Sequence, residues 1–120
     1  MNPPIFEVCS ADLTVQSRLG DPARLYPFGE AEPNPVKPYA VWQIVGGSPE
    51  NYLDCAPDID AMAVQIDCYA TSAALARAVA QSLRDAIEPV AHITRWSGED
   101  RDRDTNLYRY SFDVDWLVPR

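Results

Sequence analysis

The stretch that decides the fold is LYRYSFDVDWLV, residues 107–118, close to the end of the sequence. From Tyr108 to Val118, apolar side chains occupy every second position, and the positions between are polar except for Leu117. The apolar set is Tyr108, Tyr110, Phe112, Val114, Trp116 and Val118, and the polar set is Arg109, Ser111, Asp113 and Asp115. Because successive side chains of a strand point to opposite faces, this alternation predicts a long strand in the centre of a sheet.

Four other segments predict further strands of the same sheet. Residues 61–69 alternate in the same way, with Met62, Val64, Ile66 and Cys68 on one side. Residues 39–45 and 91–97 are expected strands, the first of them rich in β-branched and aromatic side chains. Residues 24–27 are an expected short strand, and residues 98–106 an expected turn.

Two segments predict helices. Leu75, Val79, Leu83 and Ile87 recur in steps of four residues, after a cap at Thr71 or Ser72 and before the helix-ending Pro89. The first nineteen residues carry an apolar stripe of helical spacing. We expect that helix to be capped by Asn2, to end at Gly20 and to be divided at Asp12.

The order of these elements predicts one α+β domain over residues 1–120. It should contain a mostly antiparallel sheet of about four to five strands, with helices packed on one face. Two segments fall outside this pattern. Residues 27–38 hold four prolines, and residues 46–60 separate two strands by more than a tight hairpin allows. Both are expected to be long loops or arms.

Composition excludes several classes of function. Of the 120 residues, 18 are Asp or Glu and 10 are Lys or Arg, which gives a net charge of −8. An acidic chain is a poor non-specific ligand for nucleic acid or anionic lipid. It has no apolar run of membrane-spanning length, and its start lacks the features of a signal peptide, so we expect cytoplasmic synthesis and no membrane partner.

Catalytic and metal-binding signals are weak. His92 could be the general base of a hydrolase, but no nucleophile motif accompanies it, and a strand histidine is more often an ordinary sheet residue. The run 100–104 resembles the opening of a calcium loop but has Thr105 and Ser111 where such a loop needs Gly and Glu. The cysteines Cys9, Cys55 and Cys68 form no disulfide or zinc pattern. We expect no catalytic residue, cofactor or metal.

The charges are distributed unevenly. No Lys or Arg occurs between Pro38 and Ala76, whereas this segment holds Glu50, Asp54, Asp58, Asp60 and Asp67. Such a run is either an ordinary solvated face or a surface that repels phosphate or meets a basic partner. Tyr52 and Leu53 lie in the same segment. They either contact a partner or fold back onto the sheet.

Four segments, taken in order, resemble a known family. They are RLYPFGE at 24–30, PYAVWQ at 38–43 followed by GSPENYL at 47–53, DID at 58–60 leading into VQIDCYA at 64–70, and YRYSFDVDWL at 108–117. Together they resemble the tail completion, or tail terminator, proteins of long-tailed bacteriophages and gene transfer agents. The resemblance runs essentially from end to end.

The resemblance implies a structural virion protein without enzyme activity or cofactor. Such proteins form a ring, typically a hexamer, that caps the tail tube, ends tail elongation and joins the tail to the head. The implied partners are further copies of the chain, the tail tube protein and the head-side connector or stopper protein. DNA passes through the ring without specific binding. The implied location is the head-proximal end of the virion tail, with assembly in the host cytoplasm.

Two sets of site residues follow as hypotheses. The subunit or tail-tube interface is expected at Pro49, Glu50, Asn51, Tyr52 and Leu53. The acidic side chains facing the lumen are expected to be Glu50, Asp54, Asp58 and Asp60. The alternative function is a small cytoplasmic protein-binding adaptor that uses the same loop without catalysis. Self-association into rings separates the two readings.

Overall fold

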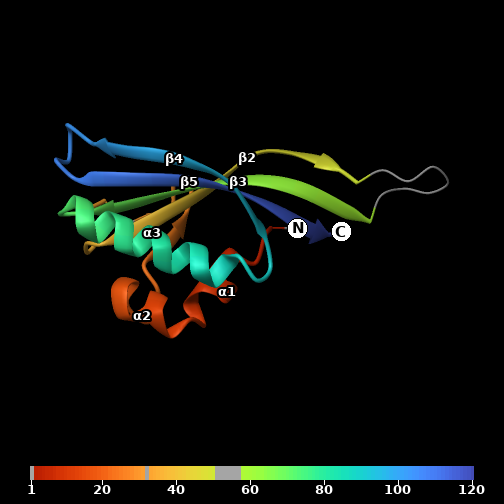
Figure 1. Ribbon diagram of the computed structural model, residues 1–120, viewed down its shortest axis with the longest axis horizontal. Coiled ribbons are helices and arrows are strands. Elements are labelled where there is room, and N and C mark those ends of the chain that lie inside the picture. The colour runs from red at the N-terminus through yellow and green to blue at the C-terminus, as the bar shows by residue number, and fades with distance from the viewer. Residues whose placement is uncertain (1, 32, 51–57) are drawn as a thin grey trace.

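Within the described ranges, residues 2–31, 33–50 and 58–120, the computed structural model has one five-stranded sheet and three helices. The elements along the chain are α1 Ile5–Ser10, α2 Leu13–Leu19, β1 Leu25–Pro27, β2 Tyr39–Pro49, β3 Ile59–Ala70, α3 Ala73–Ile87, β4 His92–Arg101 and β5 Tyr108–Pro119. The helices cover one face of the sheet and leave the other open (Figure 1). The expected α+β class, with helices on one side, is confirmed.

The strand order is β1-β2-β3-β5-β4, and only the short β1–β2 pair is parallel. β5 therefore lies between β3 and β4, as its alternation predicted. One row of cross-strand partners runs through Trp42, Ile66, Phe112 and Trp96. This row places the apolar positions of four strands on the same face.

The core lies between that face and α3. Phe112 and Val114 of β5 are fully buried, as are Leu83 and Ile87 of the helix. Burying an aliphatic or aromatic side chain of this size stabilises a fold by roughly 1.5–3 kcal/mol. Ser72 caps α3 by accepting a hydrogen bond from the backbone N–H of Leu75, so the expected helix and its cap are confirmed.

The N-terminal helix is divided at Asp12, which then caps the second piece. Its carboxylate accepts hydrogen bonds from the backbone N–H groups of Thr14 and Val15, at 2.9 and 3.0 Å. Gly20 ends α2 with a φ of 86°, a conformation that glycine adopts without strain. The expected cap at Asn2 is wrong: α1 begins at Ile5, and Pro4 is the residue before it.

The expected loop at residues 46–60 is too long at both ends. β2 continues to Pro49 and β3 begins at Ile59, so residues 46–49 pair with residues 60–63. A bulge between Ile44 and Gly46 precedes this extension. A Cβ on Gly47 would lie 2.8 Å from the carbonyl oxygen of Ala61, so the glycine permits a close approach of the strands. Gly-Gly-Ser-Pro is typical of turns, but here it extends a strand.

One other strand also extends farther than expected. β4 continues to Arg101, so the expected turn at residues 98–106 begins later. Residues 28–31 and 33–38 contain turns and bends but no strand or helix, in the segment where a loop was expected at residues 27–38. The strands of the β2–β3 and β4–β5 hairpins are therefore longer than the sequence indicated.

Candidate functional site

The candidate interface lies at one end of the sheet. β2 and β3 run on past the helices there, with the chain end beside them (Figure 1). We call residues 46–49 of β2 and 59–62 of β3 the arm. Pro49 ends β2, and the backbone N–H of Glu50 donates to the carbonyl oxygen of Ile59 across the arm at 2.9 Å. The expected members Asn51, Tyr52, Leu53 and Asp54 lie outside the described residues.

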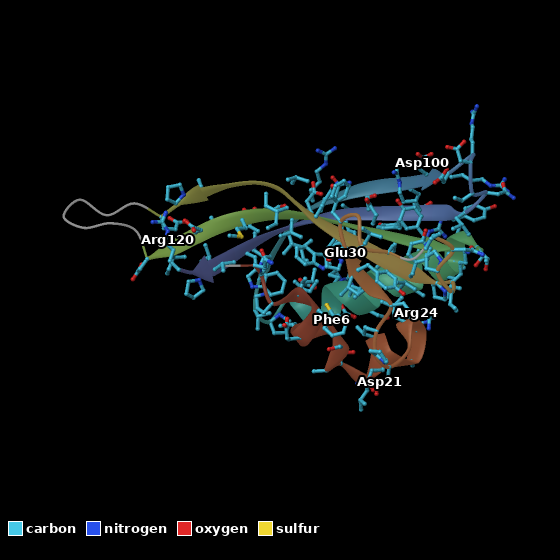
Figure 2. All side chains as sticks on the ribbon, turned by 180° about the vertical axis from the view of Figure 1, so that it is seen from behind. Phe6, Asp21, Arg24, Glu30, Asp100 and Arg120 are labelled. Atoms are coloured by element: carbon cyan, nitrogen blue, oxygen red, sulfur yellow. The ribbon has the colours of Figure 1, made fainter. Side chains whose placement is uncertain are left out.

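The end of the chain is tied to the arm. The backbone N–H of Arg120 donates to the carbonyl oxygen of Asp58 at 2.8 Å. The guanidinium of Arg120 donates to Oδ1 of Asp60, with Nη2 at 3.0 Å and Nε at 3.1 Å. Arg120 thus places one positive charge beside the acidic residues of the arm (Figure 2).

This ion pair changes the interpretation of the acidic set. Of the four residues expected to face a lumen, the structure describes Glu50, Asp58 and Asp60 and brings all three to the same end of the sheet. The charge of Asp60 is compensated by Arg120, so Asp60 is not a bare lumenal carboxylate. Sequence analysis missed Arg120, because only the strand register shows that the chain end returns to this point.

Exposed apolar side chains surround the arm. Ile44 is 44% exposed and Val45 53% exposed on β2, and Leu117 is 57% exposed on β5. An open hollow of about 280 Å³ lies on the arm itself. Its lining residues are Ile44, Gly46, Gly47, Ser48, Pro49, Asp60, Ala61 and Met62. A wide, mostly apolar surface of this kind is better suited to a protein contact than to a small molecule.

The open face of the sheet carries a row of tyrosines. The rings of Tyr39 and Tyr69 stack with centroids 5.1 Å apart, and Tyr26 lies 6.5 Å from Tyr39. Arg109 forms a side-chain hydrogen bond with Tyr69, and its Nη2 donates to Oδ2 of Asp100 at 3.1 Å. Burial raises the pKa of Tyr69, with a further contribution from Asp67. These contacts connect the side chains of neighbouring strands on the open face of the sheet.

Asp67 also belongs to the segment between Pro38 and Ala76 that lacks Lys and Arg, and its side chain forms hydrogen bonds within the sheet. Its Oδ1 accepts a hydrogen bond from the hydroxyl of Ser111 on β5 and another from Nε2 of Gln65, the latter at 3.1 Å. Ser111 is 7% exposed. Asp67 therefore links β3 to β5.

His92 does not gain a catalytic setting. It lies exposed at the start of β4, opposite Asp115 on β5, beside a hollow of about 440 Å³. The lining residues of that hollow are Glu88, Pro89, Val90, Ala91, His92, Asp115 and Leu117, a set without a hydroxyl or thiol nucleophile. Among the residues that the structure describes around this hollow, His92 has no partner for nucleophilic catalysis.

The cysteines of the described residues are structural. Cys9 and Cys68 are both buried and unbonded to one another. Burial, with a smaller effect of Asp12, raises the pKa of the Cys9 thiol to about 12. Burial also raises the pKa of Cys68. Because the thiolate is the reactive form, both side chains behave as small apolar core groups.

Metal and membrane sites were also sought in the described ranges. No group of three or more His, Cys, Asp or Glu side chains there is arranged to hold a metal ion. Over the same residues, none of the helices has the length and apolar character needed to cross a bilayer.

Comparisons with known proteins complete the description. Among the curated proteins, none matches this chain in sequence. A solved structure described as "Virion of native gene transfer agent (GTA) particle" contains a similar chain. The TM-score is 0.73 at 15% identity, over 97% of this chain and 92% of that one, which is a likeness of fold. A family model described as "Tail completion protein gp17" matches residues 3–119. The chain therefore belongs to the tail completion protein gp17 family, whose members are structural phage-tail proteins and not enzymes.

Proposed function

We propose that this protein caps the finished tail tube as a homo-oligomeric ring, ends tail elongation and forms the head–tail joining interface. The observation that carries the proposal is the arm, with exposed Ile44, Val45 and Leu117 around it, in a chain of the tail completion family. Its partners would be further copies of itself, the tail tube protein and the head-side connector or stopper protein. Its location would be the head-proximal end of the tail, after assembly in the host cytoplasm.

A closed ring needs heterologous contacts, in which one surface of a subunit meets a different surface of the next. The molecule offers unlike ends for this purpose. The arm and Arg120 lie at one end of the sheet, and Asp100 lies at the other (Figure 2). A hexamer is the ring size expected from the family resemblance. The match of fold to a chain of a gene transfer agent virion supports a place in such a particle.

The charge of the arm suits a passage for DNA. A basic lining would bind phosphates and release their counterions, whereas acidic walls leave DNA free to move. Glu50, Asp54, Asp58 and Asp60 are the lumenal carboxylates that we propose, and Arg120 offsets the charge of Asp60. Pro49, Glu50, Asn51, Tyr52 and Leu53 remain the proposed contact with a neighbouring subunit or with the tube.

The test mixes purified protein with polymerised tail tubes and examines them by light scattering and negative-stain microscopy. Caps at one tube end, or free rings, are the expected result. The variant Val45→Ser/Leu117→Ser removes exposed apolar groups beside the arm and should weaken capping. Leu13→Ser is the matched control, because Leu13 is 79% exposed on α2, away from the arm. A protein that stays monomeric and ignores tubes contradicts the proposal.

A further inference from the structure

The outer edge of β2 is open beyond Trp42. β1 pairs with residues 40–42 and ends at Pro27. The backbone N–H of Glu30 then donates to the carbonyl oxygen of Pro27 at 3.0 Å, which turns the chain away from the strand direction. On this side, residues 43–49 of β2 pair with no strand in the described part of the chain. An unpaired edge of this length is a template for another strand.

The alternating direction of the backbone N–H and C=O groups along β2 shows which of them face the open edge. The backbone N–H of Ala40 donates to the carbonyl oxygen of Arg24, on the β1 side, at 2.9 Å. Strand residues repeat every two positions, so the N–H and C=O groups of Ile44 point to the same side. Two exposed apolar side chains lie near this edge. Val45 is on β2, and Phe28, the residue after β1, is 73% exposed. The edge therefore offers both hydrogen-bonding groups and apolar surface.

The sheet has a second free edge of different character. β4 is the last strand at the opposite side of the sheet, next to β5. It carries Arg95 and Arg101 as well as Glu99 and Asp100, and its Trp96 is 39% exposed. The two acidic residues are paired within the subunit, Glu99 with Arg77 and Asp100 with Arg109. Arg95 is exposed and makes no ion pair with any residue that the structure describes. One edge of the sheet thus ends in the acidic arm, and the other presents an uncompensated cation.

Charge decides which strand fits the β2 edge. Two β2 edges from two copies would bring the arms together, and at each arm the acidic residues Glu50, Asp58 and Asp60 outnumber the single cation, Arg120. Like charges placed opposite one another destabilise a strand pair. The β4 edge brings the positive charge of Arg95 toward the same acidic groups, which is favourable. Pairing of unlike edges is therefore preferred over pairing of like edges.

We propose that residues 43–49 of β2 pair with the outer edge of β4 from a second copy of this chain, so that the sheet continues from subunit to subunit. The proposal rests on the proposed ring and names the surfaces that close it, because each subunit has one β2 edge and one β4 edge. Bulges interrupt both edges, between Ile44 and Gly46 on β2 and at Thr94 and Ser97 on β4. Bulges bend a strand and limit continued pairing, so the shared ladder should be short.

Disulfide trapping between differently tagged copies tests this pairing. In a Cys55→Ser background, one copy carries Val45→Cys or Ser48→Cys and the other carries Thr94→Cys or Arg95→Cys. Several combinations are needed, since a disulfide requires Cα atoms within about 7 Å and the pairing register is open. The remaining cysteines are buried and do not compete. Leu13→Cys on the second copy is the matched control, because it is exposed on the helical layer.

At least one mixture of a β2 variant with a β4 variant should give about tenfold more disulfide-linked dimer between the two differently tagged copies than the mixture with Leu13→Cys. The reason is that strand pairing raises the effective concentration of one thiol near the other. Equal yields in all mixtures overturn the proposal, as does a preference for Val45→Cys with itself. The result is independent of tube capping. Capping without β2–β4 trapping on the tube-bound protein refutes the edge pairing alone. Trapping by a protein that never caps tubes supports the edge pairing and refutes the proposed function.

Discussion

Arg120, the last residue of the chain, holds Asp60 at the start of β3, with its Nη2 3.0 Å from the carboxylate Oδ1. Together with the hydrogen bond from its backbone N–H to the carbonyl oxygen of Asp58, this contact fastens the end of β5 to the outer end of the arm. The two residues lie 60 positions apart in sequence. Residues 59–62 of the arm thus pair with β5 as well as with β2, and the Arg120–Asp60 ion pair lies where β5 ends.

Removing the Arg120–Asp60 ion pair should loosen the arm without unfolding the protein. Arg120→Ala deletes a partly exposed ion pair, and such pairs contribute about 0–1 kcal/mol to stability. We expect a small loss in the free energy of unfolding but faster hydrogen exchange at residues 59–62. Arg103→Ala, at the β4–β5 turn, is the control. An unchanged rate of hydrogen exchange at residues 59–62 of Arg120→Ala would show that the Arg120–Asp60 ion pair has no role in ordering the arm.

The buried thiols give a pH-dependent prediction. The folded-state pKa of Cys9 is raised to about 12, above the ordinary value of about 8.5 for an unfolded thiol. The unfolded chain therefore loses this proton first, and the stabilising contribution, complete below about pH 8.5, falls as pH rises toward 12. Urea unfolding at a series of alkaline pH values should show this decline.

A thiol reagent checks the same point directly. In a Cys55→Ser background, Cys9 and Cys68 should stay unmodified at pH 8 until denaturant unfolds the chain, because both are fully buried. Rapid modification of the folded protein at pH 8 contradicts the structure. Slow modification that follows the unfolding rate agrees with it.

Two proline substitutions on neighbouring residues should separate folding from assembly. Ile44→Pro removes an N–H that points outward from β2, and proline is tolerated on an edge strand in that position. Gln43→Pro removes an N–H directed toward β3 and breaks the ladder. We expect Ile44→Pro to remain folded but to lose self-association. We expect Gln43→Pro to lose roughly 1–3 kcal/mol of stability, because its ladder partner is left without a hydrogen bond. Circular dichroism melts and sedimentation velocity measure the two effects, and normal assembly by Ile44→Pro counts against the β2 edge.

The double variant Tyr52→Ser/Leu53→Ser tests the remaining interface hypothesis. If these side chains contact a neighbouring subunit or the tube, tail joining should be abolished while the melting temperature of the monomer stays within a few degrees. Phage or particle titre and a thermal melt of the free subunit are the two measurements. A large drop in melting temperature would mean that the pair belongs to the core of the fold.

Charge reversal tests the lumen hypothesis. Glu50→Lys/Asp54→Lys replaces two acidic groups by basic ones, which should bind phosphates and slow DNA passage in a salt-dependent way. Asp85→Lys/Glu88→Lys, at two exposed acidic positions near the end of α3, makes the same change in net charge and is the control. DNA ejection followed by dye fluorescence gives the rate. An unchanged rate in the double variant removes the support for an acidic lumen at these positions.

The parts of the fold that sequence predicted are those with strong local periodicity. The alternation of residues 108–118 and the four-residue steps of α3 depend on one buried face each, and both elements were found as expected. Asp12 as a division of the first helix was likewise visible, because a capping carboxylate has a local signature. These elements bury enough apolar surface that tertiary context reinforces the local pattern.

The parts that sequence missed depend on register and on neighbours. Gly46-Gly47-Ser48-Pro49 is a sequence typical of turns. In the structure it continues β2, after the bulge at residue 45 and with Gly47 close to the backbone of Ala61. The Arg120–Asp60 contact and the open β2 edge follow from how five strands are ordered, which no local pattern encodes. The proposed site residues therefore lie on the β2–β3 hairpin, but the sequence showed neither the length of that hairpin nor its contact with Arg120.

The most direct measurement is negative-stain microscopy of polymerised tail tubes with and without the purified protein, paired with its mass by light scattering. The proposed function predicts a ring-shaped cap at one end of each tube and tubes that no longer elongate when fresh tube protein is added. Bare tubes that continue to grow in the presence of excess, correctly folded protein would contradict it.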